Sequence, residues 1–416
     1  PEQGVEIVTP VIIAPPDGAG VGGDVTYTPK TSAITDIVEV GGINISETEI
    51  GEASSPTCIV CAGDITYSFS SSPNRGDDQR QWKSSDGGVN WQTINMPANW
   101  SSDSFRYDFG FYLEGSGKVW ASSAEGNSSL AGCWTDDEGA TWNEVYFPST
   151  PATNQTFAWG YSATAINPEG NAGMLVAVPV GKDDSCYWTD LNLGTFRKSS
   201  SSTFISYAKS VVYSPEANVW CCIQQNDPDE LYTSNDGITW TNRDSSSLSN
   251  SGSRCITYNQ ATKQFVNLGN NQVCTSTDGL TWSLISTLRT NTPAGKSQIW
   301  MKVERSEGTG IMVACSSEGD VASSSDEGVT WSYPSFTAGN LPDMYNIDWS
   351  STHGRFILGG SQRSASSAII WTTNGRDKSN SLTLANANTY NADTDADMDQ
   401  PISETFTAGQ LVTGVK

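Results

Sequence analysis

The stretch S-S-D-E-G-V-T-W at residues 324–331 is one copy of a phrase that recurs through the chain and decides the fold. The shared pattern is Ser or Thr, any residue, Asp or Asn, any residue, Gly, any residue, Thr, Trp, with small departures in some copies. Four further copies occupy residues 84–91, 135–142, 233–240 and 275–282. Five copies of one eight-residue phrase indicate a repeat architecture.

Two degenerate copies fill the gaps in the series. T-D-L-N-L-G-T-F at residues 189–196 is one residue tighter between its acid and its aromatic, and T-T-N-G-R at residues 372–376 has no aromatic. The closing aromatics stand at positions 91, 142, 196, 240, 282 and 331, and the seventh copy falls near 375. The sequence therefore predicts seven units of 42 to 54 residues.

The phrase has the chemistry of a tight turn between two strands. Its acid can accept backbone N–H bonds across the turn, and its Gly can adopt the positive φ that a Cβ disfavours. The Trp is expected to pack back onto the sheet. We therefore predict a structural role for Asp86, Gly88, Trp91, Asp137, Gly139, Trp142, Asn235, Gly237, Trp240, Asp278, Gly279, Trp282, Asp326, Gly328 and Trp331.

Short alternating strands precede each copy, and no segment has a sustained helical period. In one unit, C-I-T-Y at residues 255–258, Q-F-V-N-L-G at 264–269 and Q-V-C-T at 272–275 are separated by polar turns. Seven such units predict an all-β fold, a seven-bladed β-propeller of four-stranded antiparallel blades over residues 52–390. An extended N-terminal arm over residues 1–51 and an acidic C-terminal tail over 391–416 would flank it.

The repeated phrase resembles the Asp-box, or BNR repeat, of sialidases, sortilin-type receptors, photosystem-assembly propellers, some xyloglucanases and many phage virion proteins. The resemblance implies a box on the outer rim, between the third and fourth strands of each blade and away from the central channel. The segments at residues 28–40, 381–388 and 407–415 resemble those that flank BNR propellers in virion proteins of tailed phages.

The charge balance limits the classes of partner that we expect the protein to bind. Lys and Arg number 22 against 46 Asp and Glu, which gives a formal net charge of −24. The electrostatic field of a protein with this negative charge repels nucleic-acid backbones and anionic membrane surfaces. No apolar run reaches the roughly 18 residues of a membrane span, and the N-terminus lacks a signal pattern. We expect neither a nucleic-acid nor a membrane partner.

Cysteine and histidine usage leaves few catalytic options. The nine cysteines are an odd number and are scattered, so they are interpreted as mostly buried free thiols. Cys58 and Cys61 form a lone C-x-x-C, which is too few ligands for a closed zinc site. The one histidine, His353, lies in a polar turn-like stretch, which disfavours Ser-His-Asp and Cys-His catalysis. The F/Y-R-I-P phrase of sialidases is missing.

Two further groups are candidate sites. Asp393, Asp395, Asp397, Asp399 and Glu404 have the oxygen-ligand spacing of an EF-hand-like Ca²⁺ loop. Met398 stands where that loop needs Gly, so a solvated acidic linker is the favoured interpretation, and no cofactor is otherwise expected. Trp100 and Trp159 lie outside the repeat pattern and are predicted to be exposed ligand contacts.

The first functional hypothesis is a non-enzymatic virion protein, such as a capsid decoration, fibre or tail-associated subunit. It would be assembled in the host cytoplasm, would be extracellular on the particle, and would display the propeller for protein or glycan contact. Its arms would bind other virion or assembly proteins, and a host surface glycan is a candidate ligand. The alternative is a sialidase-like or other glycoside hydrolase or depolymerase, and a third class is a cellular assembly factor or receptor module.

Overall fold

The computed structural model describes residues 38–40, 43–52, 56–70, 81–97, 109–122, 129–149, 157–179, 186–199, 208–224, 230–243, 245, 248, 253–269, 271–288, 299–307, 309–317, 319–333, 343–361 and 367–374.

Six sheets are built from strands that follow one another along the chain and pair antiparallel, as short polar turns between alternating segments favour. Five have four strands and one has three. Their strands are β3 (Pro56–Ala62), β4 (Ile65–Ser70), β5 (Gln81–Ser84) and β6 (Gln92–Ile94); β7 (Gly110–Leu113), β8 (Lys118–Ser122), β9 (Leu130–Thr135) and β10 (Asn143–Tyr146); β11 (Phe157–Ile166), β12 (Ala172–Pro179), β13 (Tyr187–Thr189) and β14 (Arg197–Lys198); β15 (Ala208–Ser214), β16 (Val219–Gln224), β17 (Glu230–Ser234) and β18 (Thr241–Arg243); β19 (Ser253–Asn259), β20 (Gln264–Gly269), β21 (Gln272–Ser276) and β22 (Ser283–Thr287); and β23 (Trp300–Arg305), β24 (Met312–Ser316) and β25 (Val321–Ser324).

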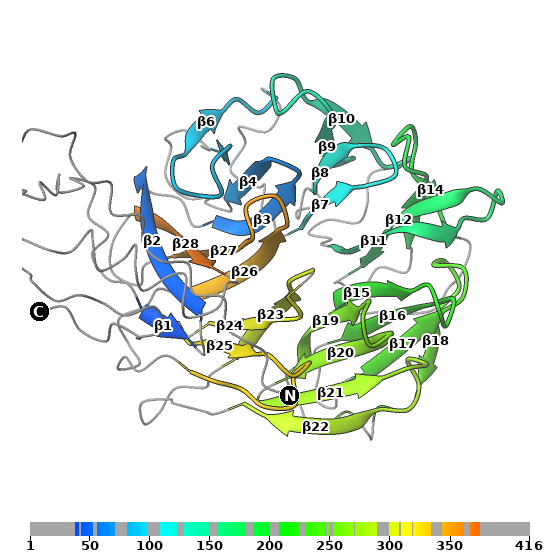
Figure 1. Ribbon diagram of the computed structural model, residues 1–416. Coiled ribbons are helices and arrows are strands. Elements are labelled where there is room, and N and C mark those ends of the chain that lie inside the picture. The colour runs from blue at the N-terminus through cyan, green and yellow to red at the C-terminus, as the bar shows by residue number, and fades with distance from the viewer. Residues whose placement is uncertain are drawn as a thin grey trace, which may run out of the picture.

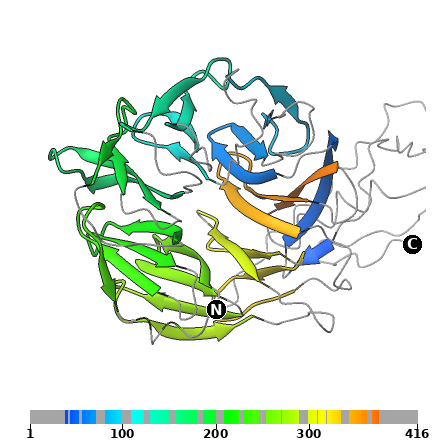
Figure 2. The same ribbon diagram turned by 180° about the vertical axis from the view of Figure 1, so that it is seen from behind.

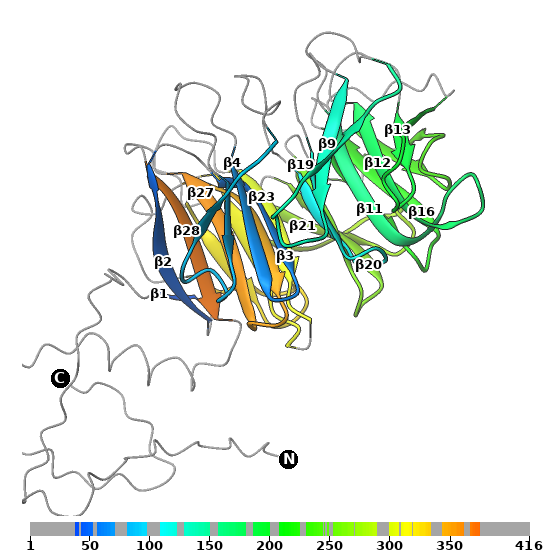
Figure 3. The same ribbon diagram turned by 90° about the horizontal axis from the view of Figure 1, so that it is seen from above.

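A further sheet of five strands combines segments from both ends of the described chain, and we call it the composite sheet. Its order is β1 (Val38–Val40), β2 (Ile43–Glu52), β28 (Ser367–Asn374), β27 (Arg355–Ser361) and β26 (Asp343–Ser350). β2 and β28 pair antiparallel, with Asn44 opposite Asn374 and Glu52 opposite Ser367. Figure 3 shows the blue β2 alongside the orange β28. Residues 38–51, assigned to the arm from sequence, therefore include two strands of this sheet.

The sheets surround a common axis (Figures 1 and 2), and the innermost strand is the first one in the six consecutive sheets and β26 in the composite sheet. The inner strands contact one another in a closed series, β3, β7, β11, β15, β19, β23 and β26, and β26 contacts β3 again. The molecule is therefore an all-β propeller with blades of mostly four antiparallel strands. This part of the sequence-based prediction is confirmed.

The hydrophobic core is divided into clusters between neighbouring sheets. Trp120, Trp159 and Phe196 are buried between the second and third sheets, and Ile59, Trp82 and Ile357 between the composite sheet and the first. Each sheet thus shields the apolar face of the next, which a single blade could not do alone.

In the four-stranded sheets the repeated phrases form the turns between the third and fourth strands, and the copy after β25 leads into an isolated bridge between Ser323 and Ser332. In the copy after β25, the Ser324 hydroxyl donates to Asp326 Oδ1 at 2.8 Å and accepts the Gly328 N–H at 2.8 Å. Asp326 Oδ1 also accepts the Thr330 N–H at 2.8 Å, and Trp331 Nε1 donates back to the Gly328 carbonyl at 2.9 Å. The same carboxylate pattern recurs at Asp86, Asp137 and Asp278.

The turns come in two lengths. The copies ending at Trp91, Trp142 and Trp331 place two consecutive residues at positive φ, such as Glu327 (59°) and Gly328 (88°). The copies ending at Trp240 and Trp282 have one residue fewer between Ser and Thr, and only their Gly has positive φ.

The shorter turn corrects one predicted residue. Asp236, not Asn235, accepts the Ser234 hydroxyl at 2.8 Å and the backbone N–H groups of Ile238 and Thr239 at 2.9 and 2.7 Å. Asn235 is exposed. The Ser hydroxyl reaches the residue two positions on, so the Ser position sets the acid position.

Five of these turns, among the described residues, also receive a hydrogen bond from a side chain of the preceding sheet. The donor and acceptor pairs are Arg355 and the Asp86 carbonyl (3.4 Å), Lys83 and Glu138 (2.8 Å), Lys118 and Asn192 (2.9 Å), Ser199 and Ile238 (3.1 Å), and Ser286 and Gly328 (2.6 Å). The turns therefore join neighbouring blades as well as neighbouring strands.

We predict that Asp236→Ala lowers the free energy of unfolding by about 1–2 kcal/mol, because two backbone donors lose their acceptor. Asn235→Ala, its matched control, should change it by less than about 0.5 kcal/mol, as exposed substitutions usually do. Urea unfolding monitored by tryptophan fluorescence measures both. Equal losses in the two variants would contradict the assignment of Asp236.

The nine cysteines are free, and all are buried except Cys61, which is half-buried. Burial raises the pKa of Cys255 to about 11 and that of Cys315 to about 12. Cys58 and Cys61 lie three positions apart on β3, so their side chains leave opposite faces of the strand and do not converge on one ion.

Because the thiolate is the reactive species, we expect no more than one thiol of the native protein to react with a disulfide reagent within minutes at pH 8. All nine should react after unfolding in guanidinium. Rapid reaction of several thiols per chain in the native protein would show that the core is open to the reagent.

Candidate functional site

A cavity of about 1050 Å³ lies on the axis of the propeller, and all seven inner strands contribute to its lining. Aromatic side chains from β7, β11 and β26 form part of the wall, and charged side chains gather on β23 and β26. Concave sites with aromatic walls and a few polar groups are typical of ligand binding. This cavity is therefore the candidate functional site.

Asp348 fixes one wall of the cavity. Its Oδ2 accepts the Cys61 N–H at 2.7 Å, and its Oδ1 accepts the Trp349 N–H at 3.0 Å. The first bond joins β26 to β3, the inner strands at the two ends of the ring. Burial raises the pKa of Asp348, which Lys302 opposes. This carboxylate is mainly structural, since both oxygens accept backbone donors.

Lys302 and Glu304 present charge to the cavity with few protein partners. Lys302 Nζ donates to Asn346 Oδ1 at 3.3 Å, and Glu304 Oε1 accepts the Arg305 N–H at 3.2 Å. Within the described part of the chain, no ion pair within 4.0 Å joins Lys302 to Glu304 or Asp348. Burial raises the pKa of Glu304 to about 7, although Lys302 lowers it.

These residues occupy equivalent positions on adjacent strands. β23 and β26 each carry a bulge near their start, after which Lys302 corresponds to Asn346 and Glu304 to Asp348. The matching positions on three other inner strands hold Cys58 and Val60, Ser210 and Val212, and Cys255 and Thr257. Lys302, Glu304 and Asp348 thus lie on one side of the cavity, and Lys209 on β15 and Glu114 after β7 are further charged residues of the lining. Spacing alone does not align these positions, because the distance to the following turn Ser differs between units, from 21 residues at Cys255 to 26 at Cys58.

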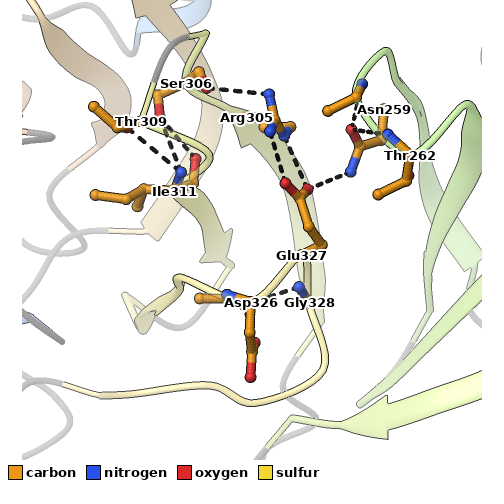
Figure 4. A network of polar contacts seen from close by, with 11 residues as sticks. Asn259, Thr262, Arg305, Ser306, Thr309, Ile311, Asp326, Glu327 and Gly328 are labelled. Carbon is orange, nitrogen blue, oxygen red and sulfur yellow. Dashed lines mark hydrogen bonds and ion pairs between the residues drawn. The ribbon is translucent and has the colours of Figure 1, made fainter. Parts of the chain in front are cut away.

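Arg305 also lines the cavity, but its guanidinium is held by Glu327 (Figure 4). The two bonds, Nη2 to Oε1 at 2.6 Å and Nε to Oε2 at 2.9 Å, form a bidentate pair. Asn259 Nδ2 donates to the same carboxylate at 2.6 Å. Among the described residues, Arg305 is the one arginine in the lining, so they do not form the arginine trio of a sialidase.

Of the predicted ligand contacts and metal ligands, Trp159 alone falls within the described residues, and it belongs to the cavity lining. Trp159 is only 1% exposed, because β11 is an inner strand and its indole packs on Trp120 at 5.4 Å between ring centroids. It is therefore not the exposed contact expected. Trp100, Asp393, Asp395, Asp397, Asp399 and Glu404 lie outside the described residues. The described part holds no cluster of three or more His, Cys, Asp or Glu that could bind a metal ion.

Comparisons with known proteins identify the fold. No family model and no curated protein matches the sequence. The solved structure of YCF48 bound to D1 peptide is 12% identical, with a TM-score of 0.55 over 79% of this chain and 95% of that one. YCF48 from Cyanidioschyzon merolae is 14% identical, with a TM-score of 0.54 over 79% and 98%. The Dos1 propeller is 10% identical, with a TM-score of 0.51 over 78% and 93%.

At such identities the likeness concerns the fold alone. The chain is therefore similar in fold to YCF48, a BNR-like propeller, and to other propellers. The described part of the chain contains no helix that is long and apolar enough to cross a bilayer.

We predict that Glu304 makes stability depend on pH. Its native pKa of about 7 lies above the ordinary 4.5, so the folded state holds the proton more tightly than the unfolded chain. The resulting stabilisation is complete below about pH 4.5 and is lost as the pH rises through about 7. The free energy of unfolding should fall by about 1–3 kcal/mol between pH 5 and 8 on this account.

Urea unfolding at pH 5, 6, 7 and 8 measures the effect. Glu304→Gln should remove most of the fall, and Glu216→Gln, in the turn between β15 and β16, should retain it. An unchanged slope in Glu304→Gln would contradict the assignment.

Proposed function

We propose that the chain is a non-enzymatic virion protein that displays its propeller for contact with a protein or glycan. The observation that carries the proposal is the position of the two ends of the described part of the chain, Val38 and Asn374, in the composite sheet. Val38 pairs with Ile45, and Ile45 pairs with Thr373, so the described chain enters and leaves at the same end of the composite sheet. An attachment through the flanking segments would hold the ring at one blade and leave the other blades free.

The composition of the flanking segments supports attachment to a partner. Residues 1–37 are interrupted by five Pro and five Gly, and residues 375–416 are rich in polar and acidic residues, compositions typical of extended segments. Parts of them resemble segments that flank BNR propellers in virion proteins of tailed phages. The solved structure of YCF48 carries a D1 peptide, which supports protein contact as a use of this fold.

We also infer that the composite sheet serves as the seventh blade. β26, β27, β28 and β2 supply four strands in the order of a regular blade, and β1 adds a fifth. Strand β2, from the start of the described chain, then completes the last blade, so that no open face is left in the ring.

Purification of virus particles from the source culture tests the virion assignment. Peptides from residues 38–374 should co-sediment with nuclease-resistant genomes in a density gradient and should remain after salt washing. If these peptides were absent from particles but abundant in the soluble cell fraction, the virion assignment would be overturned and a cellular assembly factor would be favoured.

A second candidate is a glycoside hydrolase with Glu304 as the acid. The supporting observation is a half-buried carboxyl group with a pKa of about 7 that lies near a second carboxylate in the cavity. A screen with bacterial surface polysaccharides would detect reducing ends, and Glu304→Gln should lower the rate about 100-fold or more. Absence of hydrolysis, or equal hydrolysis by Glu304→Gln, would exclude this role for Glu304.

A further inference from the structure

We propose that the axial cavity binds a neutral sugar unit through Lys302, Glu304 and Asn346. The inference rests on the glycan contact in the proposed function and assigns that contact to the cavity rather than to the outer rim. The site comprises these three polar side chains on β23 and β26 together with the aromatic side chains that line the same cavity.

The polar groups have hydrogen-bonding capacity that the protein leaves unused. Lys302 has three N–H donors and, among the described residues, makes one side-chain bond, a long one of 3.3 Å to Asn346. Glu304 uses one oxygen for a backbone N–H at 3.2 Å. Half-buried charged groups are costly to desolvate without partners, so a ligand that satisfies them gains several hydrogen bonds at once.

The mixture of charges selects the class of ligand. A small cation would meet Lys302, and a small anion would meet Glu304 and Asp348. A hydroxyl group can donate to a carboxylate and accept from an ammonium, so adjacent sugar hydroxyls match a lysine and an acid on one wall. A neutral polyhydroxylated ligand fits this arrangement better than an ion of either sign.

The rest of the cavity suits the apolar face of a sugar ring. Trp349, Tyr161 and Phe111 line it and are half-buried, and the Phe111 and Tyr161 rings lie 6.1 Å apart between centroids. The volume of about 1050 Å³ is at the upper end of the range for ligand pockets, roughly 300–1,000 Å³. A short oligosaccharide therefore has room beside the polar wall.

Asp348 has a different role in this site. Its oxygens accept the N–H groups of Cys61 and Trp349, so it positions β26 against β3 and does not contact the sugar. Its substitution should reduce stability as well as binding, so it is unsuitable as a binding variant.

A glycan array that includes neutral oligosaccharides and bacterial surface polysaccharides, probed with the full chain, tests the proposal. We expect the array to retain the protein on neutral glycans. In calorimetric titration, Lys302→Met and Glu304→Gln should each lower the affinity for the tightest-binding glycan about tenfold or more. Lys263→Met and Glu216→Gln change an ion pair (3.2 Å) between the β19–β20 and β15–β16 turns, outside the cavity lining, and should leave binding unchanged.

Thermal unfolding of each variant establishes that it is folded. If Lys302→Met unfolds, Glu304→Gln and Asn346→Ser carry the test. Retention of no neutral glycan, or equal affinity in the cavity variants and the Lys263 and Glu216 controls, would overturn the cavity site. Neither result bears on co-sedimentation with particles, so failure of the site and failure of the virion assignment are distinguishable.

Discussion

The pairing of β2 with β28 is the constraint on which the rest of the structure depends. Without it, the composite sheet would lack the strands beyond β28, and the outer edge of β28 would be left unpaired. Near the axis, the bond from Cys61 to Asp348 joins the first sheet to the composite sheet, across 287 residues of sequence. Because each blade shields its neighbours, closure at this one place protects the apolar faces of the whole ring.

The Asp-box turns and the cavity contribute differently to this architecture. In the regular turns the carboxylate is bonded within the turn, and five of the described turns also receive a donor from the preceding sheet, as with Lys83 and the Glu138 carbonyl. The polar groups of the cavity wall make fewer hydrogen bonds to the described protein atoms, and Lys302 and Glu304 can form further ones. Rigid, satisfied turns on the rim thus support a less satisfied polar site on the axis, a distribution that suits binding by a fixed scaffold.

The sequence was sufficient for the propeller, because five copies of one turn fix the repeat and each turn is a local structure. It was insufficient where distant segments meet. Asn235 and Asp236 both precede Gly237, and only the reach of the Ser234 hydroxyl separates them. Strand β2 pairs with residues more than 300 positions away, which no local pattern encodes. Trp159 lies outside the box pattern, yet an inner strand buries it, and the charges on β23 become a site only beside β26.

Hydrogen exchange of the backbone amides of β2 tests ring closure most directly. If β2 completes the composite sheet, peptides covering residues 43–52 should exchange as slowly as those covering residues 367–374, because both open only when the ring opens. Exchange of residues 43–52 within seconds, while β27 and β26 remain protected for hours, would show that the N-terminal strand does not close the propeller.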